Sequence, residues 1–240
     1  MPADPVEVAT RLVGERFPGA RAAFLGGSAP TARRTAWSDL DVVVVLDGPP
    51  APFRDTLRYD GWIVELFVQT PTSLAHYWRK DAAARRTPLL RMVAEGVILA
   101  GTDSAAEAYR ARAAALLAVG PAAPPTRTVD MQRYLVTDLV DDLRGCSDPV
   151  EIAYLAATLV LATSDLLLLA ENRWSARGKW LPRRLAEIDP DLPGRLAAAQ
   201  RAVVVGGDRE PLVAAVLSVL DHTGGPLQEG FRLAGEDPGR

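Results

Sequence analysis

The segment FLGGS at residues 24–28 is followed ten residues later by DLD at residues 39–41, which runs directly into the apolar segment VVVVL at residues 42–46. Alternate side chains of a strand project from opposite faces, so Asp39 and Asp41 are expected on one face, about 7 Å apart along the backbone. Two carboxylates held this close repel each other unless a cation lies between them. Because Mg²⁺ sites that handle phosphates use one or two protein carboxylates and keep several waters, the pattern indicates metal-assisted phosphate chemistry.

A third carboxylate lies in the apolar segment WIVELFV at residues 62–68. In a strand, Ile63, Glu65 and Phe67 share one face, and a carboxylate between two apolar side chains is costly to bury without a partner. A metal ion, another cation or a reacting hydroxyl would offset that cost. The alternatives are an edge-strand glutamate that faces water and, for Asp39 and Asp41, an ordinary turn before a buried strand.

Taken together, Gly27-Ser28, the Asp39-Leu40-Asp41 motif with its apolar strand, and Glu65 resemble the signature of the DNA polymerase beta nucleotidyltransferase superfamily. Within it, the pattern resembles the small bacterial branch of aminoglycoside and minimal nucleotidyltransferases. The resemblance implies an α+β fold, in which a mixed sheet with flanking helices is followed by an all-helical C-terminal domain. In such a layout the substrate lies between the two halves.

The same resemblance implies a metal-dependent nucleotidyltransferase. It would transfer a nucleoside monophosphate, AMP from ATP, to a hydroxyl of a small molecule such as an aminoglycoside-like antibiotic, and release pyrophosphate. Asp39, Asp41 and Glu65 would be both the catalytic and the metal-binding residues, for two Mg²⁺ ions. Two alternatives stay open: adenylylation of a protein or tRNA, as in toxin-antitoxin relatives, and nucleotide binding without turnover.

The nucleotide-binding residues are expected around the glycine-serine turn. A short helix at residues 29–34 would make Ser28 its N-cap and leave free N–H groups as an anion site. Gly27 has no side chain, so a triphosphate could approach the backbone closely, and Arg33 could donate to the leaving pyrophosphate. The chain departs from the family pattern here, because APTA at residues 29–32 stands where relatives commonly have a small residue, an arginine and a glycine.

Hydrophobic periodicity and turn signals predict a catalytic domain at residues 1–120 and a helical substrate-binding domain at residues 126–240, joined by the segment GPAAPP at residues 120–125. The dipeptide Asp60-Gly61 predicts a hairpin that places Glu65 on a strand. In the first domain we expect helices at 5–17, 72–84, 87–95 and 103–118, and strands at 21–26, 41–46, 53–59, 62–69 and 97–100. In the second domain we expect helices at 127–144, 149–171, 182–188, 193–204 and 209–221.

The segment NRWSARGKWLP at residues 172–182 follows the longest predicted helix. Its tryptophans could stack on a base while its cations neutralise phosphate oxygens, with Lys179 as the point charge. It could equally be an interhelical loop whose tryptophans fill the core. Asp138, Asp141 and Asp142 on a preceding helix are either a solvated face or the source of a base for the acceptor hydroxyl.

Composition excludes several classes of protein. A net charge of -3 argues against a nucleic-acid polymerase or a nucleic-acid partner, since such proteins carry a strongly basic surface. The single cysteine, Cys146, excludes an intramolecular disulfide and is typical of a reducing cytoplasm. We read the apolar segment at residues 152–170 as a core helix, so no membrane partner is expected. The expected partners are a nucleoside triphosphate and a hydroxylated small molecule, and a homodimer stays open.

Overall fold

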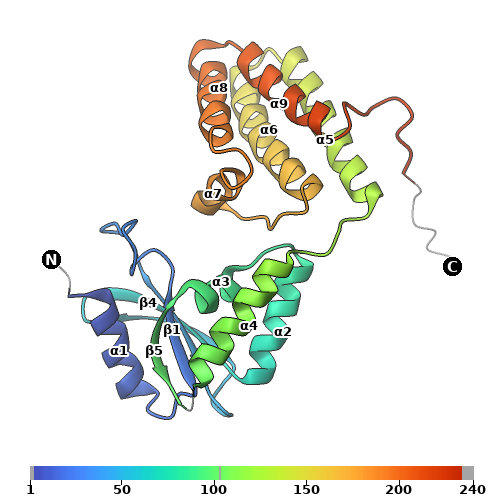
Figure 1. The fold of residues 1–240 in the computed structure, drawn as a ribbon. Coiled ribbons are helices and arrows are strands. Elements are labelled where there is room, and N and C mark those ends of the chain that lie inside the picture. Colours follow the sequence, from blue (N-terminus) through green and yellow to red (C-terminus); the bar gives the residue numbers. More distant parts are fainter. Residues whose placement is uncertain (1–2, 103, 234–240) are drawn as a thin grey trace, which may run out of the picture. The chain divides into compact units, whose positions relative to one another are not determined.

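The computed structural model describes residues 3–102 and 104–233, and in it the chain forms two compact units that meet in the sequence between Pro121 and Ala122 (Figure 1). The first unit combines a mixed sheet with helices, and the described part of the second unit contains helices without strands. The predicted α+β class is therefore confirmed. The elements of the first unit are α1 Pro5–Arg16, β1 Ala22–Gly26, β2 Leu40–Val45, β3 Phe53–Tyr59, β4 Trp62–Gln69, α2 Pro71–Ala83, α3 Pro88–Glu95, β5 Val97–Gly101 and α4 Ala105–Val119.

The five strands of the first unit lie in the order β3-β4-β2-β1-β5. The pair β2 and β4 is parallel, and the other three pairs are antiparallel. In the parallel pair Asp41 is the register partner of Glu65, and on its other side Asp41 is the partner of Gly26 in β1. Strand pairing therefore brings the second aspartate of the DLD motif, the candidate third carboxylate and the glycine turn to neighbouring positions.

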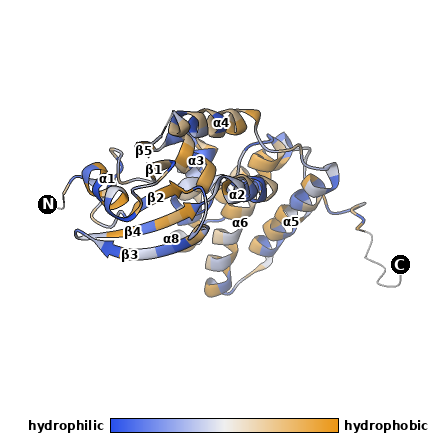
Figure 2. Cartoon of the chain, turned by 90° about the horizontal axis from the view of Figure 1, so that it is seen from below, coloured by the Kyte–Doolittle hydropathy of each residue, from blue (hydrophilic) through white to orange (hydrophobic). Residues whose placement is uncertain are grey.

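Each face of the sheet has its own hydrophobic core. The valines of β2 are β-branched and completely buried on both faces of this strand, which the sheet order places between β4 and β1. Val42 and Val44 belong to the core that includes residues of α1, whereas Val43 and Val45 belong to the core that includes residues of α2, α3 and α4. By the alternation of a strand, Asp41 lies on the face that carries Val43. The edge strand β3 is mostly hydrophilic (Figure 2).

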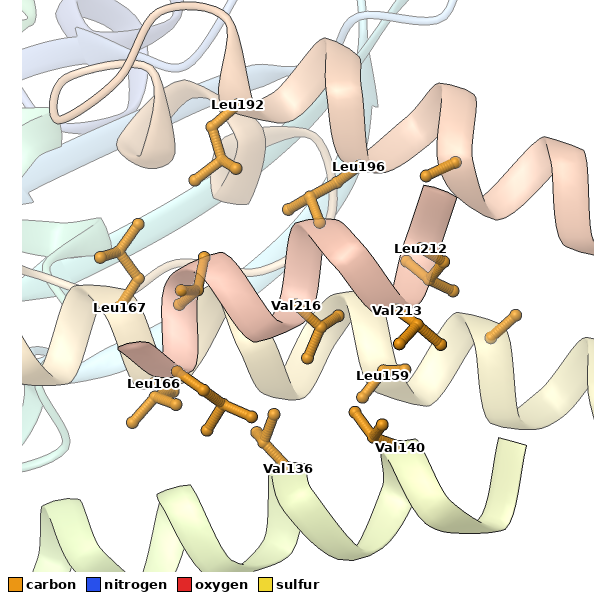
Figure 3. Packing of buried hydrophobic residues seen from close by; sticks show 14 of the residues in the cluster. Val136, Val140, Leu159, Leu166, Leu167, Leu192, Leu196, Leu212, Val213 and Val216 are labelled. Atoms are coloured by element: carbon orange, nitrogen blue, oxygen red, sulfur yellow. The ribbon is translucent and has the colours of Figure 1, made fainter. Parts of the chain in front are cut away.

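The second unit is a set of packed helices around a single core. Its elements are α5 Thr126–Gly145, α6 Pro149–Ala170, the 3₁₀ turn η1 Gly178–Trp180, α7 Leu181–Leu185, α8 Leu192–Gly206 and α9 Glu210–His222. Asp148 caps α6, because its carboxylate accepts the N–H groups of Val150 and Glu151 at 2.7 and 3.1 Å. Figure 3 shows Val136 of α5, Leu159 of α6 and Val216 of α9 directed into the shared core.

Helix α6 is the one helix among the described residues that is long and apolar enough to cross a membrane by length and composition. This is weak evidence for a span, because the core helix of a folded bundle passes the same test. Several of its residues do belong to the core of the second unit, namely Ala156, Leu159, Leu166, Leu167 and Leu168.

Leu159→Ala is expected to destabilise the second unit by about 2–5 kcal/mol, since truncating a leucine in a packed core leaves a cavity. The Leu159 side chain is completely buried, whereas Leu161 on the same helix is 54% exposed. The matched variant Leu161→Ala should change the free energy of unfolding by no more than about 0.5 kcal/mol. Urea unfolding followed by circular dichroism measures both, and equal losses would contradict the core placement of Leu159.

Candidate metal centre

Three carboxylates meet at the sheet. Asp39, Asp41 and Glu65 each offer one oxygen, and these oxygens all lie within 4.8 Å of one another in half-buried positions. Asp39 directly precedes β2, Asp41 is its second residue, and Glu65 is its neighbour on β4. No other group of three or more histidine, cysteine or acidic residues is arranged in this way in residues 3–102 and 104–233. The structure therefore brings together the three carboxylates singled out in the sequence.

The donor set fits a hard divalent cation. Carboxylate oxygens without histidine or cysteine are the ligands of Mg²⁺, Mn²⁺ or Ca²⁺ rather than of zinc or copper. Two oxygens bound to one Mg²⁺ at about 2.1 Å can be at most about 4.2 Å apart, so a cluster spanning up to 4.8 Å needs only a small contraction. The cluster could therefore bind a divalent metal ion.

The glycine pair makes room for the carboxylates. Gly27 has φ +70°, and a Cβ at this position would lie 2.1 Å from the Oδ2 atom of Asp41. A Cβ on the preceding Gly26 would lie 2.7 Å from the Cγ atom of Met92 in α3. The end of β1 therefore runs between the Asp41 carboxylate and α3 with no space for side chains. The backbone at Gly27 lies against the candidate metal ligand itself.

The short helix expected at residues 29–34 is wrong, because this segment forms consecutive turns. The N–H of Thr31 bonds to the carbonyl of Ser28, and the N–H of Arg34 bonds to that of Thr31, but no i to i+4 bond follows. The Ser28 hydroxyl, which would have capped such a helix, lies 3.0 Å from the Ser38 hydroxyl instead. The anion site expected from a helix N-terminus at Ser28 therefore has no structural basis.

Ser28 instead holds the two ends of the loop together. Its buried hydroxyl lies 3.0 Å from the hydroxyl of Ser38, and the Ser38 hydroxyl also accepts the N–H of Thr35. Ser38 immediately precedes Asp39, so this contact restrains the backbone that carries the first carboxylate. Between the two serines, Trp37 is 96% exposed.

The remaining predicted site residues are exposed. Arg33 lies in the loop between β1 and β2, and Lys179 lies in η1 of the second unit. Their contacts with phosphate stay predictions, as do the roles of Gly27 and Ser28 toward a nucleotide.

In the segment at residues 172–182, Trp174 is buried. The Arg183 guanidinium, just after this segment, stacks over the Trp180 ring at 4.3 Å from its centre. Both observations favour a structural role for these tryptophans.

The sequence reasoning missed Arg54. Its Nη2 atom donates to Oε2 of Glu65 at 2.7 Å, and its guanidinium lies 4.7 Å from the centre of the Phe67 ring. Glu65 is thus neither unpartnered nor deeply buried: its side chain is 26% exposed and has a cation beside it. The hairpin turn at Asp60-Gly61 contained the necessary signal, because a two-residue turn pairs Tyr59 with Trp62 and so, counting outward, residue 54 with residue 67.

No protein-family model matches this chain, and no curated protein matches it. Among solved structures, the chain is similar to the nucleotidyltransferase-like protein from Exiguobacterium sibiricum 255-15. The two share 12% sequence identity with a TM-score of 0.46, and the match covers 91% of this chain and 73% of that chain. A likeness this weak carries no argument about activity, so the case for a function rests on the residues of the site.

Proposed function

We propose that the chain is a metal-dependent nucleotidyltransferase that transfers AMP from ATP to the hydroxyl of a small molecule. The observation that carries this proposal is that one carboxylate oxygen from each of Asp39, Asp41 and Glu65 lies within 4.8 Å of the other two. Asp41 and Glu65 are on adjacent strands, and Asp39 directly precedes the first of them. The Gly27 backbone, which leaves no room for a Cβ beside Asp41, supports it. A site of hard oxygen ligands suits a metal bound to a phosphate chain.

In this proposal the three carboxylates hold two Mg²⁺ ions. When bound, such ions lower the pKa of the attacking hydroxyl and neutralise the triphosphate and the leaving pyrophosphate. Asp39 and Asp41 would hold the ions, and Glu65 would complete the binding of one and take the hydroxyl proton. The acceptor oxygen forms a bond to the α-phosphorus while the bond from that phosphorus to pyrophosphate breaks. The Ser28 and Ser38 contact keeps Asp39 oriented during this exchange.

The other substrate contacts follow the family resemblance. Arg33 would neutralise the leaving pyrophosphate, and Lys179 would contact phosphate oxygens from the helical unit. The helical unit would supply the acceptor pocket, and aminoglycoside-like antibiotics are the acceptor class that we propose first. Such an enzyme would act in the cytoplasm, where ATP and Mg²⁺ are plentiful, and would confer antibiotic resistance.

The test is an assay of the purified chain with α-labelled ATP, Mg²⁺ and a panel of hydroxylated antibiotics. We expect label on at least one acceptor with equal release of pyrophosphate, and complete loss of both when EDTA removes the metal. Label on a protein or RNA band after incubation with cell extract would show that the acceptor is a macromolecule and not a small molecule. Tight ATP binding without pyrophosphate release in any of these mixtures would contradict an enzymatic function.

A further inference from the structure

We infer that Arg54 is a positioning residue for Glu65, an inference that rests on the proposed function. Arg54 reaches the candidate metal centre from the edge strand β3 and touches the carboxylate that comes from β4. It is not one of the metal ligands. Its proposed role is to hold the Glu65 carboxylate in the orientation in which one oxygen is directed to the cation.

The strand register explains how Arg54 reaches Glu65. In the antiparallel pair of β3 and β4, Arg54 is opposite Phe67 and Thr56 is opposite Glu65. Opposite residues share a face, so Arg54 is a diagonal neighbour of Glu65, at a Cα separation of about 7–8 Å that a long side chain can span. Figure 2 shows β3 and β4 side by side. The sheet therefore presents Arg54 to Glu65 without any help from a loop.

Two contacts restrain the Arg54 side chain itself. The guanidinium stacks over the Phe67 ring at 4.7 Å from its centre, and Nη2 donates to Oε2 of Glu65 at 2.7 Å. A planar guanidinium can stack and donate at once, whereas a lysine ammonium cannot. With one carboxylate oxygen held by Arg54, rotation of the Glu65 side chain is limited. The other oxygen stays available to a cation.

The charges of the cluster give this contact a further effect. Three carboxylates within 4.8 Å repel one another, and without a nearby cation the most mobile of them would turn toward water. Arg54 places one positive charge beside the three negative ones, which lowers this repulsion. The ion pair and the cluster coexist in the same structure, so Arg54 does not withdraw Glu65 from Asp39 and Asp41.

Arg58 provides a matched control on the same strand. It is opposite Ile63, so it lies on the same face as Arg54 and is the diagonal neighbour of Glu65 on the other side. Both arginines are exposed, and within the described part of the chain Arg58 forms no ion pair. Removing either arginine takes one positive charge from the same face, but only Arg54 touches Glu65. A difference between the two variants therefore reports the contact rather than the overall charge.

The test compares the wild-type chain with Arg54→Ala, Arg54→Lys, Arg58→Ala and Glu65→Gln, using Eu³⁺ as the metal probe. Luminescence lifetimes in H₂O and D₂O give the number of waters on the bound ion. Arg54→Ala and Glu65→Gln should each raise that number by about one, because a departing carboxylate oxygen is replaced by water. Arg58→Ala should leave it unchanged, and Arg54→Lys should lie between the wild type and Arg54→Ala. The Arg54 side chain is 61% exposed, so thermal unfolding should confirm that all variants fold.

Steady-state kinetics with the acceptor found in the transfer assay supplies a second readout. Arg54→Ala should lower kcat about ten- to a hundredfold and change the KM for ATP by less than about twofold, since misplacing a ligand affects the reacting geometry more than nucleotide binding. Combining Arg54→Ala with Glu65→Gln should cost no more than Glu65→Gln alone, because Arg54 acts through Glu65.

The outcomes separate this inference from the proposed function. If Glu65→Gln gains a water and Arg54→Ala does not, Arg54 has no positioning role, and the proposed function stands. Equal effects of Arg54→Ala and Arg58→Ala also overturn the inference, because charge alone would then explain them. If the wild type binds no Eu³⁺, or if Glu65→Gln leaves the hydration unchanged, the metal centre itself is wrong and both proposals are overturned.

Discussion

Asp41→Asn is expected to abolish nucleotidyl transfer and leave the fold intact. Asp41 is the central member of the cluster, since strand pairing puts it between Gly26 of β1 and Glu65 of β4. An asparagine keeps the size of the side chain but removes the charge that a divalent cation requires. Losing a residue that only hydrogen-bonds to a metal ligand costs up to about a hundredfold in activity. Loss of a direct ligand should therefore lower kcat by more than that. The assay is pyrophosphate release at saturating ATP and Mg²⁺.

Asp55→Asn is the matched control for Asp41→Asn. Asp55 is an exposed carboxylate of the same sheet, and its register partner is Leu66, so it lies on the face opposite to Glu65. This variant should retain full turnover, and both variants should unfold at the wild-type temperature. Normal transfer by Asp41→Asn would contradict the assignment of the metal centre, and equal loss in the two variants would show that sheet charge in general is responsible.

Gly27→Ala is expected to lose activity by displacing a candidate metal ligand. The new Cβ would lie 2.1 Å from Oδ2 of Asp41, a separation that cannot persist, so the carboxylate must move by roughly 1 Å. A displacement of this size at a reacting centre costs about a hundredfold in rate. The variant should also be destabilised by about 1–2 kcal/mol, because an alanine at φ +70° adopts the left-handed region. Kinetics and chemical unfolding measure the two effects separately.

Gly207→Ala isolates the backbone part of this effect. Gly207 has φ +69°, nearly the value at Gly27, but a Cβ there would meet nothing within 4 Å. Gly207→Ala should therefore lower the free energy of unfolding by the amount that the left-handed backbone alone costs in Gly27→Ala. Its turnover should equal that of the wild type. If Gly27→Ala were destabilised but fully active, the contact between the Gly27 backbone and the Asp41 carboxylate would have no part in catalysis.

Much of the first unit could be predicted from local patterns. The valine run of β2 has the composition of a strand buried on both faces, and Asp60-Gly61 is a strong hairpin signal, so β2, β3 and β4 lie where expected. The helices of the second unit were also expected, since their apolar residues recur at helical spacing. Differences at their ends are three residues at most, because terminal turns depend on caps and on packing.

What could not be predicted depends on contacts that local patterns do not encode. The segment at residues 29–34 forms turns because the Ser28 hydroxyl bonds to Ser38, ten residues away, instead of to its own following backbone. The pair of Arg54 and Glu65 required the hairpin register to be counted out residue by residue. The parallel direction of the pair β2 and β4, and the register that puts Asp41 opposite Glu65, could not be read from local patterns because these strands are separated by another strand in the sequence.

The position of β3 at the border of the sheet has a consequence for solubility. A border strand leaves one row of N–H and C=O groups without a partner strand, and such a row can recruit the backbone of another chain. In β3 the residues Arg54, Asp55 and Arg58 put charge of both signs along this row. Charged side chains there disfavour edge-to-edge association. The same strand that delivers an arginine to Glu65 therefore also helps to keep separate copies of the protein from joining their sheets.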